Sequence, residues 1–454
     1  MNKKKYEMDM TSGALLPMLL VFSLPLIASS VLQLLFNAAD VIVVGRYAGA
    51  ESLAAVGSTS SLTNLLTNIF IGLSLGTNVA VATFYGAKKE WETREAVHTS
   101  MTLGIITGVF LAFIGFIFAR PLLTMMGTPV DVIDHSVLYM RIYFLGMPLQ
   151  MLYNFGSSIL KAVGDTKRPL YYLLLAGVIN VLLNLLFVIV FHMGVAGVAL
   201  ATVLSQIVST GLVVRCLMTA DSVIRFDIRH LSIHPKMLKK MAIIGLPAGI
   251  QGSLFSISNV LIQSSVNSFG SIVMAGNTAA QNIEGFVYVA MNSVAQTTVS
   301  FVGQNAGANK YDRVKKVILE CLMLVTIVGL VLGNLAVLGS NGLVGLYSDN
   351  AEVIGYGVIR IKLICTLYCL CGIMDTLVGG LRGLGHAIVP TIISLIGACA
   401  LRIVYIFTLF RIHHSLSELY LTYPVSWFVT AFAQMIVLII IYRKIVKSVN
   451  GDRI

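Results

Sequence analysis

The chain has 454 residues, of which 57% are hydrophobic and only 11% are charged. Soluble domains carry roughly 25% charged residues, so this composition excludes a set of soluble domains, a disordered chain and a secreted enzyme with one anchor. The formal net charge is +11, but Lys and Arg are scattered between apolar stretches, which is typical of membrane loops and not of a nucleic-acid site. The six cysteines lie in apolar segments and indicate neither disulfides nor a metal site.

Apolar runs of about 20 residues, long enough to cross a bilayer, predict an all-α polytopic membrane protein with twelve transmembrane helices. The predicted spans, in chain order, are 15–44, 53–83, 95–118, 132–155, 170–192, 196–218, 238–264, 275–303, 313–338, 353–377, 388–410 and 416–443. The first span is too long for a signal peptide and leads directly into the second. The loops are short, which leaves no room for a separate soluble catalytic domain.

Basic residues predict the orientation of these spans. Most of the 31 Lys and Arg residues fall at the amino terminus, in the loops after every second span and in the carboxyl tail, whereas the loops of the other side hold only Arg46, Arg120 and Arg411. Because cytoplasmic loops are enriched in Lys and Arg, both termini are expected in the cytoplasm, with the chain in the plasma membrane of a bacterial cell.

The chain contains an internal repeat. The stretch Leu160-Lys161-Ala162-Val163-Gly164 recurs as Leu381-Arg382-Gly383-Leu384-Gly385, and Gly86-Ala87 recurs as Gly307-Ala308 at the same offset. We therefore expect two homologous six-helix bundles, residues 1–218 and 238–454, joined by a cytoplasmic linker at 219–237. Six helices per half is an even number, so both halves enter the membrane in the same direction.

Acidic residues inside spans point to function, because a charge at mid-membrane costs roughly 2.5 to 3.5 kcal/mol on insertion scales. In the first half this residue is Asp40, which shares a helix face with Gln33 and Asn37. Spans 5 and 6 add further amides and a hydroxyl: Asn180, Asn184, Thr202 and Gln206. One carboxylate among neutral oxygens suits a proton or a sodium ion. The alternative is that the amides and the hydroxyl only hold helices together.

The second half carries a different polar set in its spans: Gln251, Asn259, Gln263, Gln281, Glu284 and Asp375. These side chains are candidates for substrate binding. Two interpretations stay open for the acids Glu284 and Asp375: they bind a cationic substrate, or they are structural partners of in-span basic residues. The basic residues concerned are Arg360, Lys362 and Arg402.

Taken together, these features resemble the multidrug and toxic compound extrusion (MATE) family of the MOP flippase superfamily over almost the whole chain. The motifs that carry the resemblance are Leu24-Pro25 with Asn37 and Asp40, the Leu160 to Pro169 loop, Gly194-Val195-Ala196-Gly197, Gly303-Gln304-Asn305-Ala306-Gly307-Ala308 and Leu381-Arg382-Gly383.

The resemblance implies an efflux antiporter that exports cationic or amphipathic organic compounds by alternating access, with two V-shaped six-helix lobes. It also implies a cation-coupling site at Asp40, Asn180, Asn184 and Thr202, next to Asn37. Many members have an aspartate where this chain has Asn184, and loss of that carboxylate favours protons over the alternative, Na+ at the same residues. Phe255 stands where a subset has an acid, so Glu284 and Asp375 are expected to take over that role.

The main alternative is a flippase for lipid-linked oligosaccharides or peptidoglycan precursors, which would need several basic residues in its cleft. An enzyme is not expected, because neither a Ser/His/Asp arrangement nor a metal-binding motif occurs. We therefore expect a secondary active transporter without cofactors. It is expected to act as a monomer in the lipid bilayer on small organic cations or amphipathic drugs, with no nucleic-acid partner.

Overall fold

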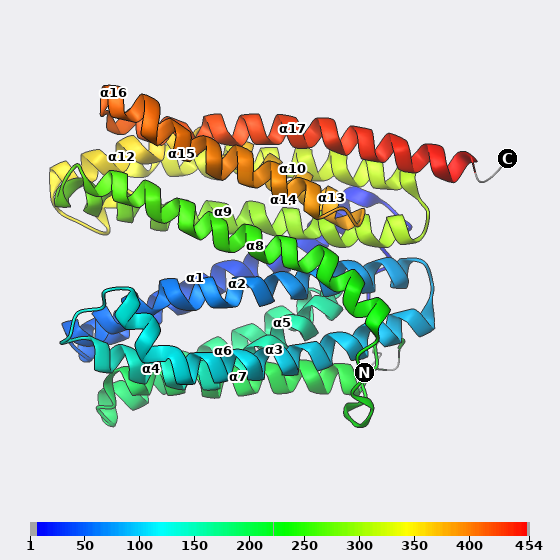
Figure 1. Ribbon diagram of the computed structural model, residues 1–454, viewed down its shortest axis with the longest axis horizontal. Coiled ribbons are helices and arrows are strands. Elements are labelled where there is room, and N and C mark those ends of the chain that lie inside the picture. Colours follow the sequence, from blue (N-terminus) through cyan, green and yellow to red (C-terminus); the bar gives the residue numbers. More distant parts are fainter. Residues whose placement is uncertain (1–6, 221, 452–454) are drawn as a thin grey trace. The chain divides into compact units, whose positions relative to one another are not determined.

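The computed structural model describes residues 7–220 and 222–451, and all regular elements in these ranges are helices (Figure 1). The described residues form two compact units. Unit 1 comprises those of Met1–Met10 with Leu24–Ile250, and unit 2 comprises Thr11–Ser23 with Gln251–Ile454. The first turns of the first long helix therefore pack within unit 2, and the first half of the helix after the linker packs within unit 1. The expected division at residues 219–237 stays a prediction.

Unit 1 is built from helices of the first half of the chain. They are α1 (Leu15–Tyr47) from Leu24 onward, α2 (Ala50–Gly86), α3 (Glu90–Met125), α4 (Ile133–Leu145), α5 (Met147–Ala162), α6 (Lys167–Leu185), the π-helical turn η2 (Leu186–Val190), α7 (Gly194–Met218), the short turn η3 (Ile228–His230) and the first half of α8 (Pro235–Asn267). The tightest packing joins α3 to α5 and α6 to α7.

Unit 2 repeats this pattern with more interruptions. Its elements after α8 are α9 (Ser271–Gly307), α10 (Tyr311–Leu338), α11 (Ser340–Gly345), α12 (Ala351–Cys365), α13 (Cys369–Gly383), α14 (Ile388–Ser394), the π-helical turn η4 (Leu395–Ala400), α15 (Leu401–Tyr405), the π-helical turn η5 (Ile406–Phe410), α16 (Arg411–His413) and α17 (Leu416–Gly451). Helix α9 lies at the centre of the unit, since it packs against α10, α12 and α13.

The helices confirm a polytopic membrane protein. In the described ranges, nine are long and apolar enough to cross a membrane, or ten if α12 and α13, bent by 46°, count as one broken span. The other two predicted spans are also helical. One is divided into α4 and α5 at Gly146, and the other is α9, which is long enough but less apolar because it carries amides such as Asn277 and Gln281 along its length.

Backbone conformation repeats between the two halves. Four residues with left-handed φ in the first half have a counterpart at the repeat offset, to within one residue, in the second. The pairs are Gly49 with Gly270 (86° and 97°), Lys88 with Asn309 (57° and 57°), Gly164 with Gly385 (95° and 86°), and His192 with His414 (51° and 42°). The internal repeat therefore extends from the sequence motifs to the turns that end the helices.

Within unit 1, glycines bring α2 and the first half of α8 into backbone contact. A Cβ atom at Gly72 would lie 2.3 Å from the amide nitrogen of Gly249, and one at Gly76 would lie 2.2 Å from the carbonyl oxygen of Met241. Gly245 and Gly249 have the same four-residue spacing as Gly72 and Gly76. This is the close approach that small residues at helix interfaces permit in membranes.

The linker between the halves is polar and partly ordered by local bonds. Asp227 begins the η3 turn, where its side chain accepts a hydrogen bond from the backbone N–H of Arg229. That bond, together with one from the His230 ring, holds the pKa of Asp227 below its ordinary value. His234 lies 3.5 Å from Glu95 of α3, so these contacts tie the linker to unit 1.

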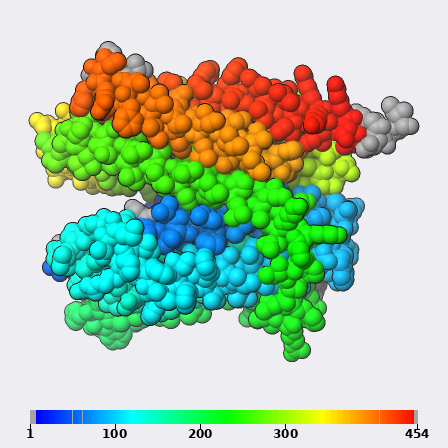
Figure 2. Space-filling model, viewed as in Figure 1, coloured from blue at the N-terminus to red at the C-terminus, as the bar shows by residue number. Residues whose placement is uncertain are grey.

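The outward faces of the long helices are apolar. Large exposed side chains include Phe110 and Phe113 on α3 and Phe428 and Phe432 on α17. Helix α17 is drawn in red in Figure 2. Soluble monomers rarely expose continuous apolar surface of this kind, whereas lipid tails cover it without penalty.

Candidate functional site

Asp40 lies at the end of a chain of hydrogen bonds in unit 1. The amide nitrogen of Asn184 on α6 donates to Asp40 Oδ1 on α1 and, at 3.3 Å, to Asn180 Oδ1. Asn180 Nδ2 in turn donates to Thr202 Oγ1 on α7 at 3.5 Å. Three helices therefore meet at one carboxylate. Asn180 and Asn184 are buried, and Asp40 and Thr202 are half-buried.

One oxygen of this cluster has no hydrogen-bond partner. Asn184 Oδ1 is buried and meets no donor in the part of the chain that the structure describes. An unpaired buried acceptor costs about 1 to 3 kcal/mol, so the position suits a bound cation, a water molecule or the O–H of a protonated carboxyl group. Among the described residues no group of three or more His, Cys, Asp or Glu side chains is arranged to hold a metal ion. The donor set is therefore one carboxylate with neutral oxygens.

Local structure widens the helix next to this cluster. Helix α6 ends at Leu185, one residue after Asn184, and continues as the π-helical turn η2. Such turns occur often at functional sites, but they leave no simple sequence signature. The sequence analysis predicted an ordinary α-helix at these positions, as part of the span at 170–192.

Two tyrosines of α4 that the sequence analysis missed lie near the carboxylate. Tyr139 and Tyr143 stack with their ring centroids 5.9 Å apart, and both lie close enough to Asp40 to interact with its charge. The Tyr143 hydroxyl also makes a 3.5 Å hydrogen bond with Gln150 Oε1. The only signal for these residues was an i, i+4 aromatic pair, which is also a common core feature.

The other predicted polar residues of unit 1 lie outside the hydrogen-bonded cluster. Gln33 and Asn37 are exposed on α1, and Gln206 is half-buried on α7. No hydrogen bond between described side chains joins any of the three to Asp40. Their roles as site residues stay predictions.

In unit 2, Glu284 of α9 is paired with Arg360 of α12. Arg360 donates from Nε and Nη2 to the two carboxylate oxygens at 2.9 and 2.8 Å, and from Nη1 to Asn277 Oδ1 at 2.9 Å. All three side chains are buried. Of the two interpretations left open for Glu284, these contacts favour the structural ion pair.

The remaining candidates of unit 2 form smaller groups. Gln251 Oε1 accepts hydrogen bonds from Arg382 at 3.0 Å and from Thr391 at 3.2 Å. Asp375 on α13 is half-buried and interacts with Tyr288, Asn292 and the charge of Arg382. Gln263 accepts from Asn277 at 2.9 Å and from Gln281 at 3.5 Å, and Asn259 is exposed. The structure thus separates residues that the sequence analysis treated as one set.

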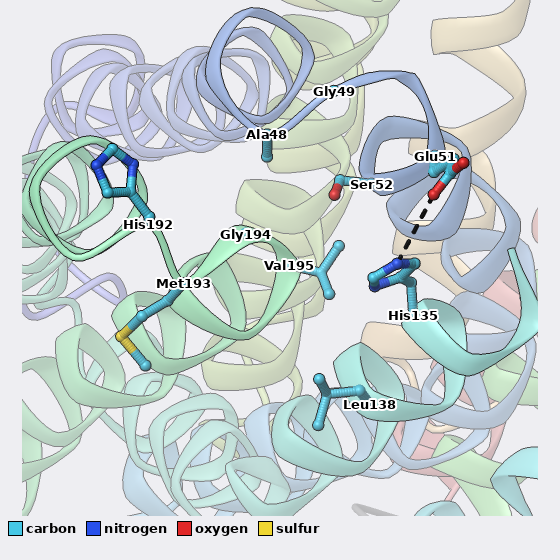
Figure 3. Close-up of a pocket in the computed structure, with 10 residues that line it drawn as sticks. All are labelled: Ala48, Gly49, Glu51, Ser52, His135, Leu138, His192, Met193, Gly194 and Val195. Atoms are coloured by element: carbon cyan, nitrogen blue, oxygen red, sulfur yellow. Dashed lines mark ion pairs between the residues drawn. The ribbon is translucent and has the colours of Figure 1, made fainter.

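Unit 1 also holds a pocket that the sequence analysis did not anticipate (Figure 3). It has a volume of about 580 Å³ and is lined by the ends of α1, α2, α4 and α7. His135 lies 3.9 Å from Glu51 on one side of the pocket, whereas His192 lies apart from this pair on the other. None of the predicted site residues lines it.

Span-length apolar helices, a structural repeat and an in-span carboxylate bonded to the Asn184 amide define a membrane transporter with duplicated halves. The chain belongs to the MatE family, whose model matches residues 25–186 and 247–408. This membership confirms the resemblance found in the sequence and the expectation that the chain is a transporter and not an enzyme.

Similar proteins cover most of the chain. The probable multidrug resistance protein YoeA of Bacillus subtilis (strain 168) is 32% identical over 83% of this chain and 82% of the relative. The probable multidrug resistance protein YpnP of the same organism is 28% identical over 87% and 88%. An outward-facing structure of a multidrug resistance MATE family transporter of the MOP superfamily matches with a TM-score of 0.90 at 21% identity, covering 96% of this chain and 98% of that one. This last match shows the same fold.

Proposed function

We propose that this chain is a multidrug efflux antiporter that exports amphipathic organic compounds, organic cations among them, in exchange for protons. The observation that carries the proposal is the bond between Asp40 and Asn184, which leaves one in-span carboxylate held by an amide. Because the amide that holds this carboxylate is neutral, Asp40 gains or loses a proton without breaking an ion pair. The names of the relatives above, as multidrug resistance proteins, support the substrate class.

In the proposed cycle, a proton from outside binds to Asp40 and neutralises its carboxylate. Its hydrogen bond with Asn184 weakens, and the protonated carboxyl group donates instead to the free Oδ1 of the same amide. Substrate leaves outward in this state, and loss of the proton to the cytoplasm resets the site. When one proton exchanges for one monovalent cation, each pH unit supplies about 1.4 kcal/mol, a tenfold substrate gradient.

Further parts of the proposal follow from the sequence. The two six-helix halves, residues 1–218 and 238–454, form the lobes that alternate in access, and both termini lie in the cytoplasm. The protein acts as a monomer in the plasma membrane. Protons are favoured over sodium as the coupling ion because Asn184 supplies no second carboxylate.

Uptake of ethidium into proteoliposomes tests the proposal. A proton gradient and a sodium gradient are imposed separately on the parent chain, on Asp40→Asn, and on Asp131→Asn, which removes an exposed carboxylate of the same unit. We expect uptake with the proton gradient in the parent and in Asp131→Asn, and none in Asp40→Asn. Uptake that requires sodium, or that persists in Asp40→Asn, would overturn the proposal. A flippase would show no gradient-driven dye uptake at all.

A further inference from the structure

Arg402 of unit 2 is a buried cation in an unusual place. It lies on α15, a single short helical segment between the π-helical turns η4 and η5, and its exposed fraction is 7%. Turns of this kind open the backbone locally and are frequent at functional sites. A charged side chain inside a span is by default a candidate functional residue.

The bonds of Arg402 hold its position but do not neutralise its charge. Its Nε donates to Ser426 Oγ on α17 at 2.8 Å. Its guanidinium carbon lies 4.4 Å from the ring centroid of Tyr423 and 5.8 Å from that of Trp427. In the described part of the chain, no carboxylate pairs with Arg402 and no acceptor meets its two terminal nitrogens.

Arg360 provides the comparison within the same unit. It also packs against Tyr423, with its guanidinium carbon 5.3 Å from the ring centroid, but three of its nitrogens bond to Glu284 and Asn277. A buried guanidinium is stable when its donors and its charge are both matched in this way. Arg402 shares the contact with Tyr423 but has no anion beside it among the described residues.

The other in-span acid of unit 2 does not supply the missing charge. Asp375 interacts with Arg382, Tyr288 and Asn292, and Glu284 is occupied by Arg360. After these pairings, Arg402 is a buried in-span basic residue of unit 2 whose positive charge no described carboxylate matches, whereas Lys362 is exposed.

The surroundings of Arg402 suit an aromatic ligand. Trp427 stacks on Tyr368, with 5.2 Å between ring centroids, and lies 5.7 Å from Tyr423. Flat apolar walls next to a guanidinium with free donors recognise a planar ring that carries a carboxylate or phosphate, because the fork of the guanidinium matches either group with two bonds.

We propose that Arg402, oriented by Ser426 and walled by Tyr423 and Trp427, binds the anionic group, a carboxylate or a phosphate, of aromatic organic anions. The site lies in unit 2 and is distinct from the Asp40 cluster of unit 1. This proposal rests on the proposed function only in that the bound anion is a transported substrate. It extends the proposed substrates from organic cations to organic anions and zwitterions.

The protein contains a natural reporter for this site. Trp427 and Trp91 are its two tryptophans, and Trp91 is exposed at the start of α3. In a Trp91→Phe background, the fluorescence of Trp427 reports binding next to Arg402 without any gradient or transport. The probes are benzoate, phenyl phosphate and, as the matched cation, benzylammonium, added to protein in nanodiscs of zwitterionic lipid.

We expect saturable quenching by benzoate and phenyl phosphate and a clearly weaker response to benzylammonium. Arg402→Gln should weaken anion binding by about tenfold or more, the effect of losing a charge-assisted bond, whereas Arg402→Lys keeps the charge but not the fork and should bind with an affinity between those of the parent and Arg402→Gln. Lys362→Gln removes an exposed positive charge of α12 and should change nothing. Asp40→Asn, which abolishes the proposed proton coupling, should bind the anions normally, so failure of that coupling and failure of this site are distinguishable.

Equal affinity in Arg402→Gln, or equal binding of benzylammonium, would overturn the proposal and leave Arg402 as a cation held only by aromatic rings. If size-exclusion chromatography shows that Arg402→Gln does not fold, the parent and Arg402→Lys test the proposal instead. Both should bind benzoate and phenyl phosphate more tightly than benzylammonium, and equal binding of the three would overturn the proposal. A second set of nanodiscs with phosphatidylglycerol separates the sources of the anion: lost benzoate binding identifies a lipid headgroup as the occupant, and unchanged binding identifies a soluble anion. No anion binding in zwitterionic nanodiscs, with no change of Trp427 fluorescence in phosphatidylglycerol, would also overturn it.

Discussion

Asp40 of α1 accepts its hydrogen bond from the amide of Asn184 on α6, and no Lys or Arg among the described residues pairs with it. The carboxylate is therefore positioned by a neutral group that stays in place whether Asp40 is charged or protonated. An ion pair in the same position would favour the charged form alone.

Asn184 is expected to position the coupling carboxylate. Asn184→Ala removes the bond to Asp40, and we expect proton-driven ethidium uptake to fall by about tenfold or more, since bonds to charged groups are worth about 1.5 to 3 kcal/mol. Asn184→Asp adds a second carboxylate at the same position. It should make uptake respond to sodium, measured with a sodium gradient at equal pH on both sides. Unchanged uptake in Asn184→Ala would contradict this role.

Asn180 and Asn37 make a matched pair for testing the extent of the cluster. Asn180 bonds to both Asn184 and Thr202, whereas Asn37 is exposed and outside the bonded chain. We expect Asn180→Ala to reduce proton-driven uptake severalfold and Asn37→Ala to leave it within about twofold. The reverse order would mean that Asn37 joins Asp40 in another state of the transport cycle.

The ion pair between Glu284 and Arg360 is expected to stabilise unit 2. Glu284→Gln leaves a buried guanidinium without its anion, and breaking a buried pair in this way costs about 3 to 5 kcal/mol. Thermal unfolding in detergent should therefore occur at a clearly lower temperature. The double variant Glu284→Gln/Arg360→Gln should recover part of the loss, and Glu352→Gln, at an exposed acid of α12, should have little effect. A thermally stable Glu284→Gln would argue that Glu284 is free for substrate.

The glycine contact between α2 and α8 is expected to tolerate no side chain. Gly72→Ala places a Cβ atom 2.3 Å from the Gly249 nitrogen, so the helices must separate, and overpacking of this kind costs about 1 to 3 kcal/mol. Gly57→Ala, on the same helix, meets no atom within 4 Å and should leave the unfolding temperature unchanged or raise it slightly. Equal stability of the two variants would show that this contact is absent in the folded protein.

Much of the fold could be predicted because lipid imposes strong patterns on a sequence. Each of the twelve predicted spans is helical, and the repeated turns follow the repeated motifs. The interruptions were not predictable. The break at Gly146 separates α4 from α5 inside one apolar run, and the π-helical turns η2, η4 and η5 depend on hydrogen bonds between residues five apart, which apolar periodicity does not report.

The candidate site was predictable only at residues whose side chains carry a large free-energy cost inside the membrane. A carboxylate inside a span is expensive, so Asp40 stood out, and the bonds to Asn184 and Asn180 join the residues that the family resemblance implied. Tyr139 and Tyr143 carry no such cost and were missed. Likewise, three basic partners were open for Glu284, and only the distances identify Arg360, because spacing along the chain says little about contacts between helices.

The most direct test of the account is to drive protons with substrate. Proteoliposomes containing the protein are loaded with an organic cation at equal pH on both sides and diluted, and the internal pH is followed with a trapped dye. Because each cation that leaves exchanges for a proton that enters, the account predicts internal acidification by the parent chain, with or without sodium, and none by Asp40→Asn. An unchanged internal pH while the organic cation leaves, or acidification that persists in Asp40→Asn, would contradict it.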